Sequence, residues 1–103
     1  MPGLNEVFGA LADPTRREVM LSLAERPGLT ASHLAGELPI TRQAIAKHLG
    51  ALSTAGLVES TRQGRETRYT LTPGPLVDAM EWMTEVGAEW DERLARLAKR
   101  SSR

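Results

Sequence analysis

The chain has 103 residues, of which 41% are apolar and 25% are charged, a composition that predicts one globular domain over residues 1–103. Equal numbers of acidic and basic residues give no net charge, so overall charge does not point to nucleic acid, and the lack of cysteine excludes disulfides and thiolate metal sites. We find no basic leader and no apolar run long enough for a membrane. We therefore expect a cytoplasmic protein without a membrane partner.

Two helices are predicted in the first quarter of the chain. Apolar residues recur three and four positions apart over residues 4–12, which is the helical period. Asp13 is a favourable N-cap and Pro14 suits the first position of a second helix. That helix is predicted to end at "RPGL" (26–29), where proline and glycine interrupt it.

Two further helices joined by a tight turn are predicted over residues 30–55. Thr30 can cap the first of them, Pro39 ends it, and Thr41 can cap the second. Apolar side chains in the second helix recur at helical spacing and should face the core. Gly56 is placed to close this helix in a left-handed turn.

The period then changes from that of a helix to that of strands. Residues 57–72 predict a two-stranded hairpin whose tip, "RQGRE", contains glycine. Residues 76–98 form the longest predicted helix, with apolar residues alternately four and three apart. The predicted fold is mainly α with a small β-hairpin. Its order of four helices, two strands and a fifth helix is that of a winged helix-turn-helix.

The outer face of the predicted fourth helix carries side chains suited to a DNA groove. In the helix-turn-helix, residues near the N-terminus of the recognition helix reach base edges, where arginine pairs with guanine and glutamine with adenine. Arg42 and Gln43 lie in this first turn, and Ala46 keeps the next turn flat. Further predicted DNA contacts come from Thr41 and Lys47 on the helix and from Arg62, Arg65 and Arg68 on the wing.

At these residues the sequence resembles the ArsR-type winged-helix regulators of bacteria. The matching segments are "LADPTRREVMLSL" (11–23), "ITRQAIAKHLGALSTAGLV" (40–58) and "RQGRETRYTL" (62–71). The resemblance implies a homodimeric, DNA-binding transcription regulator, usually a repressor. It also implies a recognition helix that carries Thr41, Arg42, Gln43, Ala46, Lys47 and His48, and a wing over residues 62–68.

The sequence departs from the metal-sensing members of that family. The resemblance would imply a cysteine pair on the helix before the recognition helix, or Asp/His clusters on the last helix. Here the third predicted helix has His33 and no thiol, and the last helix has six acids but no histidine. Carboxylates alone favour hard ions, and we therefore expect no metal site and no cofactor.

The first and last predicted helices have apolar stripes too large for one small core to cover. Gly87 interrupts the last stripe at a cost of about 1 kcal/mol relative to alanine, which suggests close approach of another helix. We predict a two-fold dimer joined by residues 4–12 and 76–98, with recognition helices about one DNA turn, roughly 34–36 Å, apart. The predicted interface residues are Leu4, Val7, Phe8, Leu11, Met80, Met83, Gly87, Trp90, Leu94 and Leu97.

Several alternatives stay open from the residues alone. His48 flanks Leu49 and has packing or capping as an equally good role. The zero net charge favours, as an alternative function, a winged-helix module that binds protein without specific DNA binding. An enzyme is not expected, because the chain has two distant histidines, no cysteine and no glycine-rich phosphate loop. The sequence does not indicate which small-molecule effector, if any, the protein binds.

Overall fold

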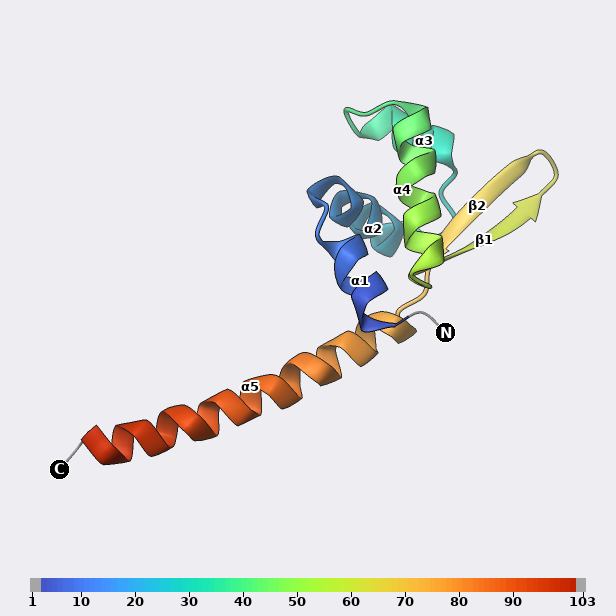
Figure 1. Ribbon diagram of the computed structural model, residues 1–103. Coiled ribbons are helices and arrows are strands. Elements are labelled where there is room, and N and C mark those ends of the chain that lie inside the picture. Colours follow the sequence, from blue (N-terminus) through green and yellow to red (C-terminus); the bar gives the residue numbers. More distant parts are fainter. Residues whose placement is uncertain (1–2, 102–103) are drawn as a thin grey trace.

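The computed structural model describes residues 3–101 and confirms the predicted order of elements (Figure 1). The first helix ends at Leu11 and the last begins at Gly74, each within two residues of the prediction. Among the described residues, no helix combines the length and the apolar character needed to cross a membrane. The elements are α1 (Leu4–Leu11), α2 (Pro14–Glu25), α3 (Ala31–Glu37), α4 (Arg42–Thr54), β1 (Val58–Gln63), β2 (Glu66–Leu71) and α5 (Gly74–Ser101).

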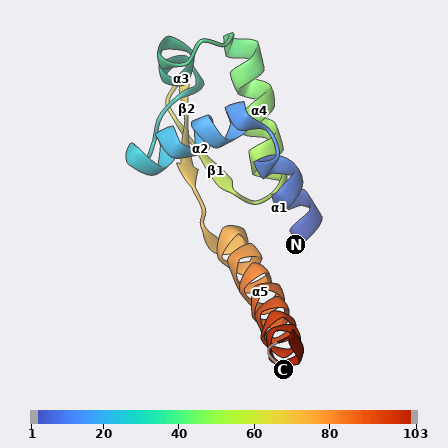
Figure 2. The same cartoon turned by 90° about the vertical axis from the view of Figure 1, so that its left-hand side faces the viewer.

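The molecule consists of a compact body and a long arm. Helices α1 to α4 pack together beside the hairpin, and α5 leaves this body and extends away from it (Figures 1 and 2). A compact domain of this size has a radius of gyration of about 13 Å, whereas the value here is 18.4 Å and the extents are 69 × 29 × 21 Å. The side chains that are almost fully buried in the body are Val7, Val19, Leu23, Leu34, Ile45, Leu49, Leu52 and Leu57.

The N-terminus of α2 is capped as the sequence predicts. The carboxylate of Asp13 accepts hydrogen bonds from the backbone N–H groups of Thr15 (2.8 Å) and Arg16 (3.2 Å). The bond from the Arg16 N–H is the main reason why the pKa of the Asp13 carboxyl lies below its usual value. Pro14 occupies the first helical position, where its missing N–H costs no hydrogen bond.

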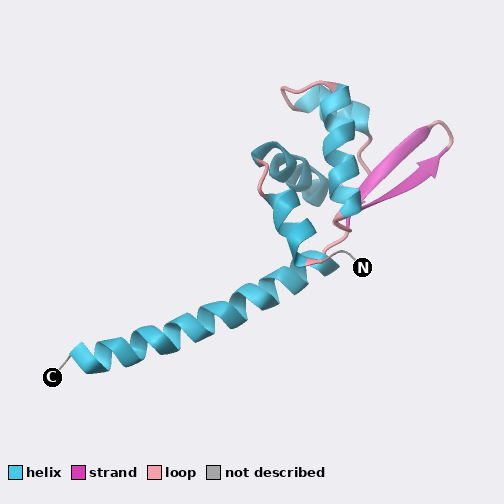
Figure 3. Ribbon diagram, viewed as in Figure 1, coloured by secondary structure: helices cyan, strands magenta, loops and turns pink. Residues whose placement is uncertain are grey.

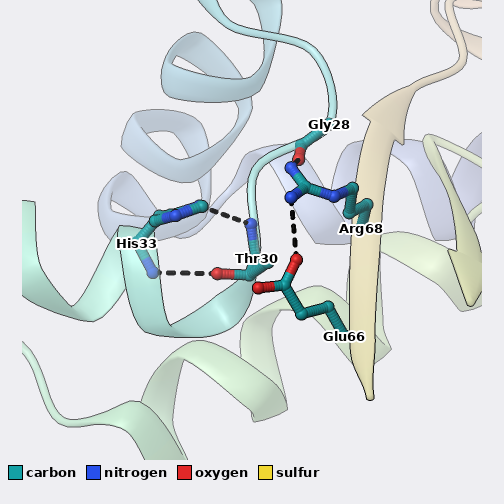
Figure 4. A network of polar contacts seen from close by, with 5 residues as sticks. All are labelled: Gly28, Thr30, His33, Glu66 and Arg68. Carbon is teal, nitrogen blue, oxygen red and sulfur yellow. Dashed lines mark hydrogen bonds and ion pairs between the residues drawn. The ribbon is translucent and has the colours of Figure 1, made fainter. Parts of the chain in front are cut away.

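The two helices of the helix-turn-helix are also capped by side chains. The hydroxyl of Thr41 accepts from the Ala44 N–H at 3.1 Å, as predicted for α4. At α3, Thr30 accepts from the His33 N–H at 3.1 Å, and His33 Nδ1 accepts in return from the Thr30 N–H at 3.2 Å. This reciprocal pair (Figure 4) gives His33 a capping role that the sequence did not predict.

The hairpin is joined to the body by backbone hydrogen bonds. Strands β1 and β2 pair antiparallel from Val58–Leu71 to Gln63–Glu66, and Gly64 opens the two-residue turn with φ +62°. On its other side, β2 pairs with the α2–α3 connection: Gly28 N–H donates to the Tyr69 carbonyl and Tyr69 N–H to the Leu29 carbonyl, both at 2.9 Å. A segment predicted only as a helix break therefore pairs with β2 through an isolated β-bridge at Leu29 and Tyr69.

The C-terminus of α4 ends in the left-handed turn that the sequence predicts. Gly56 has φ +73°, its N–H donates to the Ser53 carbonyl at 3.0 Å, and the Leu57 N–H donates to the Leu52 carbonyl at 2.9 Å. This pair of bonds is a Schellman motif, which satisfies the last carbonyls of the helix. It also turns the chain sharply, so that Leu57 enters the core directly before β1.

Replacing Gly56 by alanine is expected to lower the free energy of unfolding by about 1–2 kcal/mol, because a Cβ atom clashes with the backbone in the left-handed region. Gly50 is the matched control, since it lies within α4 and no atom stands within 4 Å of a Cβ built there. We expect Gly50→Ala to raise the free energy of unfolding by up to about 1 kcal/mol, because alanine favours the helical backbone more than glycine does. Urea unfolding measures the free energy of unfolding of both variants. If both substitutions change it in the same direction, this account of Gly56 is wrong.

Candidate nucleic-acid interface

Helix α4 divides cleanly into a buried face and an exposed face. Ile45, Leu49 and Leu52 are at most 1% exposed and fix the helix in the core. The opposite face is open to solvent and carries five of the predicted DNA contacts: Thr41, Arg42, Gln43, Ala46 and Lys47. Because the buried face admits no rotation of the helix, these side chains are presented in one fixed orientation.

A cleft of about 470 Å³ lies between α3, α4 and the wing. Arg42 and Ala46 of α4 line one side of it, and Arg65 of the wing lines another, so residues far apart in sequence share one site. Figure 3 shows the hairpin, in magenta, standing beside α4 on this side of the body. The other lining residues are Thr30, Ala31, Ser32, His33, Glu66, Thr67 and Tyr69.

The sequence did not identify Ser32, His33 or Tyr69 as part of this surface, and it placed Thr67 only within the wing at residues 62–68. Alternation along β2 does place Thr67 and Tyr69 on the same face of the strand. What brings that face against the start of α3 is the backbone pairing between Leu29 and Tyr69. No local pattern in the sequence signals this long-range pairing.

The three arginines of the wing have different surroundings. Arg65 is exposed at the turn, and Arg62 Nε donates to the carbonyl of Gly64 at 3.2 Å within the same turn. Arg68 instead donates to the Gly28 carbonyl at 2.9 Å and pairs with Glu66 at 2.7 Å, as Figure 4 shows. Its guanidinium thus joins the base of the wing to the α2–α3 connection.

His48 is held from within the protein. Arg16 Nε of α2 donates to His48 Nδ1 at 3.3 Å, and both side chains are partly buried. The structure therefore gives His48 a contact that links α2 to α4, in agreement with the alternative role that the sequence left open.

The predicted dimer residues lie in two kinds of environment. Val7 is only 2% exposed and belongs to the core of its own protomer, whereas the remaining α1 residues, Leu4, Phe8 and Leu11, are partly buried against that core. Phe8 makes an edge-to-face contact with Trp82 of α5, with ring centroids 5.6 Å apart. The α5 residues of the set are exposed: Met80, Met83, Gly87, Trp90, Leu94 and Leu97.

The charge of the α4–wing surface differs from that of the whole chain. Arg42, Lys47, Arg62 and Arg65 are exposed there, together with the acid Glu66. A neutral chain can thus still offer a locally basic surface. Among residues 3–101, no three histidine, aspartate, glutamate or cysteine side chains are grouped so that they could hold a metal ion.

An exposed recognition helix beside a hairpin with a basic tip defines a winged helix-turn-helix protein. A family model described as a helix-turn-helix domain matches residues 11–61. The transcriptional repressor SdpR of Bacillus subtilis (strain 168) is 35% identical over 80 residues, which cover 78% of this chain and 88% of SdpR. An ArsR-like transcriptional regulator from Rhodococcus sp. RHA1 has 47% identity and a TM-score of 0.82, covering 93% of this chain and 90% of its own.

The chain belongs to the ArsR family of transcriptional regulators. It is therefore a DNA-binding regulator, and the family consists of regulators and not of enzymes. Another similar structure is the cadmium metal-sensor CMTR from Mycobacterium tuberculosis, with 38% identity and a TM-score of 0.58, covering 67% of this chain and 70% of its own. Family membership favours DNA binding over a module that binds protein alone.

Replacing Arg68 by alanine is expected to lower the free energy of unfolding by about 1 kcal/mol, because the Gly28 carbonyl and Glu66 both lose their partner. Arg65→Ala is the matched control on the same hairpin and should change the free energy of unfolding by less than about 0.5 kcal/mol. Thermal and urea unfolding measure both. An Arg68→Ala protein as stable as the Arg65→Ala protein would show that Arg68 does not stabilise the wing.

Proposed function

We propose that this chain is a homodimeric repressor that binds an inverted-repeat operator and does not respond to metal ions. One observation carries the proposal: Arg42 and Gln43 are exposed in the first turn of α4, while the opposite face of the helix is locked in the core. The major groove admits one α-helix, and a fixed helix can read base edges reproducibly. Arg42 and Arg65 line the same cleft, so a duplex that meets the helix also lies near the wing.

In this proposal each exposed side chain of α4 has a distinct role. Arg42 binds guanine through two hydrogen bonds, and Gln43 binds adenine in the same way. Ala46 lets the helix approach closely, and Lys47 contacts a phosphate. Thr41 caps the helix, whose remaining free N–H groups at that end favour a phosphate.

The wing adds contacts that do not depend on sequence. Arg65, with Arg62 behind it, contacts the phosphate backbone or the adjacent minor groove. Arg68 and His48 act indirectly, since their hydrogen bonds to Gly28 and from Arg16 hold the wing and α4 in place. In this proposal Arg68 and His48 position the side chains that contact DNA and do not contact DNA themselves.

Dimer formation through α1 and α5 is supported by the exposed apolar side chains of the arm. Met80, Trp90 and Leu94 are each more than half exposed. Large contiguous apolar surfaces of this kind mark protein interfaces. A two-fold dimer presents two copies of α4, which matches an inverted repeat with half-sites about one DNA turn, roughly 34–36 Å, apart.

Repression is proposed from the relative SdpR, whose name describes a transcriptional repressor. Occupation of an operator that overlaps a promoter blocks transcription without any further activity. The absence of a metal response is supported by the donor set. The chain has no cysteine, and α5 carries carboxylates without histidine, whereas CMTR is described as a cadmium sensor.

Selection of bound DNA from a random duplex pool, at about physiological salt, tests the proposal. We expect an enriched inverted repeat with half-sites one turn apart, and a dimer on that DNA by light scattering. Affinity for the enriched site should fall steeply as salt rises, because phosphate contacts release counterions. An Arg42→Ala, Gln43→Ala double variant is the control for base reading. A pool without enrichment, or a single half-site bound by a monomer, would contradict the proposal.

Two single variants separate base reading from backbone binding. Arg42→Ala should lose about 1–3 kcal/mol of affinity for the selected site and relax its preference at one base pair. Arg65→Ala should weaken binding to all sequences about equally and lower the salt slope by about one unit. Fluorescence anisotropy on the selected site and on single-base variants measures both. An unchanged preference in Arg42→Ala would show that another residue reads that position.

A further inference from the structure

The cleft between α3, α4 and the wing carries hydroxyl groups that the proposed function does not use. They belong to Ser32 of α3 and to Thr67 and Tyr69 of β2, all of which line the cleft. Within residues 3–101, none of the three hydroxyls has a hydrogen-bond partner, so each is available to a ligand. The hydroxyl of Thr30, by contrast, already accepts the hydrogen bond that caps α3.

Backbone hydrogen bonds hold the two sides of the cleft at a fixed separation. The Tyr69 N–H donates to the Leu29 carbonyl, and the Gly28 N–H donates to the Tyr69 carbonyl, both at 2.9 Å. Helix α3 begins two residues after Leu29. Ser32 is thus tied to the strand that carries Thr67, and a ligand in the cleft meets both sides without a rearrangement of the protein.

The charge of the cleft favours an anion. Arg42 and Arg65 line the cleft, and the acid that lines it, Glu66, is paired with Arg68 at 2.7 Å (Figure 4). Because Arg68 compensates the charge of Glu66, two guanidinium groups remain in excess. A phosphate group combines negative charge with oxygen acceptors, and it binds the hydroxyls of serine, threonine and tyrosine as well as arginine.

The position of the cleft favours a phosphate of the DNA backbone as this anion. Arg42 lies in the first turn of α4 and also lines the cleft. When α4 enters the major groove, a DNA strand passes beside the helix, because the sugar-phosphate backbones border the groove. The hairpin stands on the same side of the body (Figure 3), so the strand runs between α4 and the wing.

We propose that the cleft holds one backbone phosphate of the operator and that the hydroxyls of Ser32, Thr67 and Tyr69 donate hydrogen bonds to it. The inference rests on the proposed function and adds α3 to the elements that contact DNA. Contacts of this kind carry no sequence information, but they fix the register of the protein on the duplex. Since the hydroxyls are neutral, they displace no counterions and add affinity without steepening its salt dependence.

A full-length variant without the three hydroxyls, Ser32→Ala, Thr67→Val and Tyr69→Phe, tests the contact on the selected DNA. Each lost hydrogen bond should weaken binding by roughly two- to tenfold, so we expect a total loss of about tenfold or more. The loss should be equal for the selected site and for its single-base variants. The slope of log affinity against log salt concentration should stay unchanged, whereas Arg65→Ala lowers it. A folded triple variant that binds as tightly as the natural protein would overturn the inference.

Thr70→Val is the matched control for Thr67→Val. Thr70 is exposed on the same strand, but it lies on the opposite face of the hairpin and does not line the cleft. We expect it to leave DNA affinity unchanged. If the triple variant does not fold, Ser32→Ala decides alone, because Ser32 is exposed and its substitution leaves the core intact. Its affinity should fall by roughly two- to tenfold, and an unchanged value would contradict the role of α3.

The same contact is tested from the side of the DNA with the natural protein. Methylphosphonate replaces one phosphate of the selected site at a time, which removes a negative charge and one acceptor oxygen. We expect one phosphate whose replacement weakens the natural protein strongly and the triple variant much less. If every phosphate affects both proteins equally, the hydroxyls do not bind the backbone and the inference is wrong.

The outcomes separate this inference from the proposed function. A triple variant whose preference changes at one base pair would show that the hydroxyls read a base, which would overturn the phosphate contact and leave the regulator standing. A natural protein that enriches no DNA would overturn both.

Discussion

The burial of one face of α4 is the constraint on which the rest of the interface depends. Ile45, Leu49 and Leu52 are packed among α2, α3 and β1, so the helix can neither rotate nor slide without opening a cavity. The face that remains must point outwards, and it carries Arg42 and Gln43. The same apolar contacts that stabilise the fold thus decide which side chains can meet a base pair.

The wing is fixed by a different kind of interaction. Two backbone hydrogen bonds join β2 to the α2–α3 connection, and Arg68 bonds across the same junction, while Val58, Tyr69 and Leu71 pack in or against the core. These bonds join the hairpin to the segment that leads into α3, and the cap of Thr30 and His33 then starts that helix. The distance between Arg65 and Arg42 across the cleft is therefore set by the protein before any DNA is present.

Features that depend on neighbours in the chain could be predicted from the sequence. The caps formed by Asp13 and Thr41 and the left-handed turn at Gly56 each need only a few consecutive residues, and all three are observed. The order of elements follows from periodicity for the same reason. The buried and exposed faces of α4 follow from the spacing of its apolar residues.

Apart from the local cap that His33 forms with Thr30, the features that the sequence did not predict depend on partners far along the chain. Arg68 is a basic residue of the wing and was therefore predicted to contact DNA, but it donates a hydrogen bond to the carbonyl of Gly28, 40 residues away. His48 resembles a residue of the recognition surface, but Arg16 reaches it from α2, 32 residues away. The local sequence predicts which groups a side chain is able to bind. The packing of the helices determines which of those groups lies close enough to be bound.

Within the described residues, most of the arm makes no contact with the rest of the protomer. A helix of 28 residues is about 42 Å long, and the body of the protomer packs against only its first part. Isolated helices in water are marginal, and most helical stability in proteins comes from tertiary contacts. If those contacts come from a second chain, then folding of the arm, dimerisation and the pairing of two recognition helices are one linked equilibrium. Occupation of an operator then depends on protein concentration more steeply than binding by a monomer would, and the apolar stripe of α5 becomes part of the DNA-binding function without touching DNA.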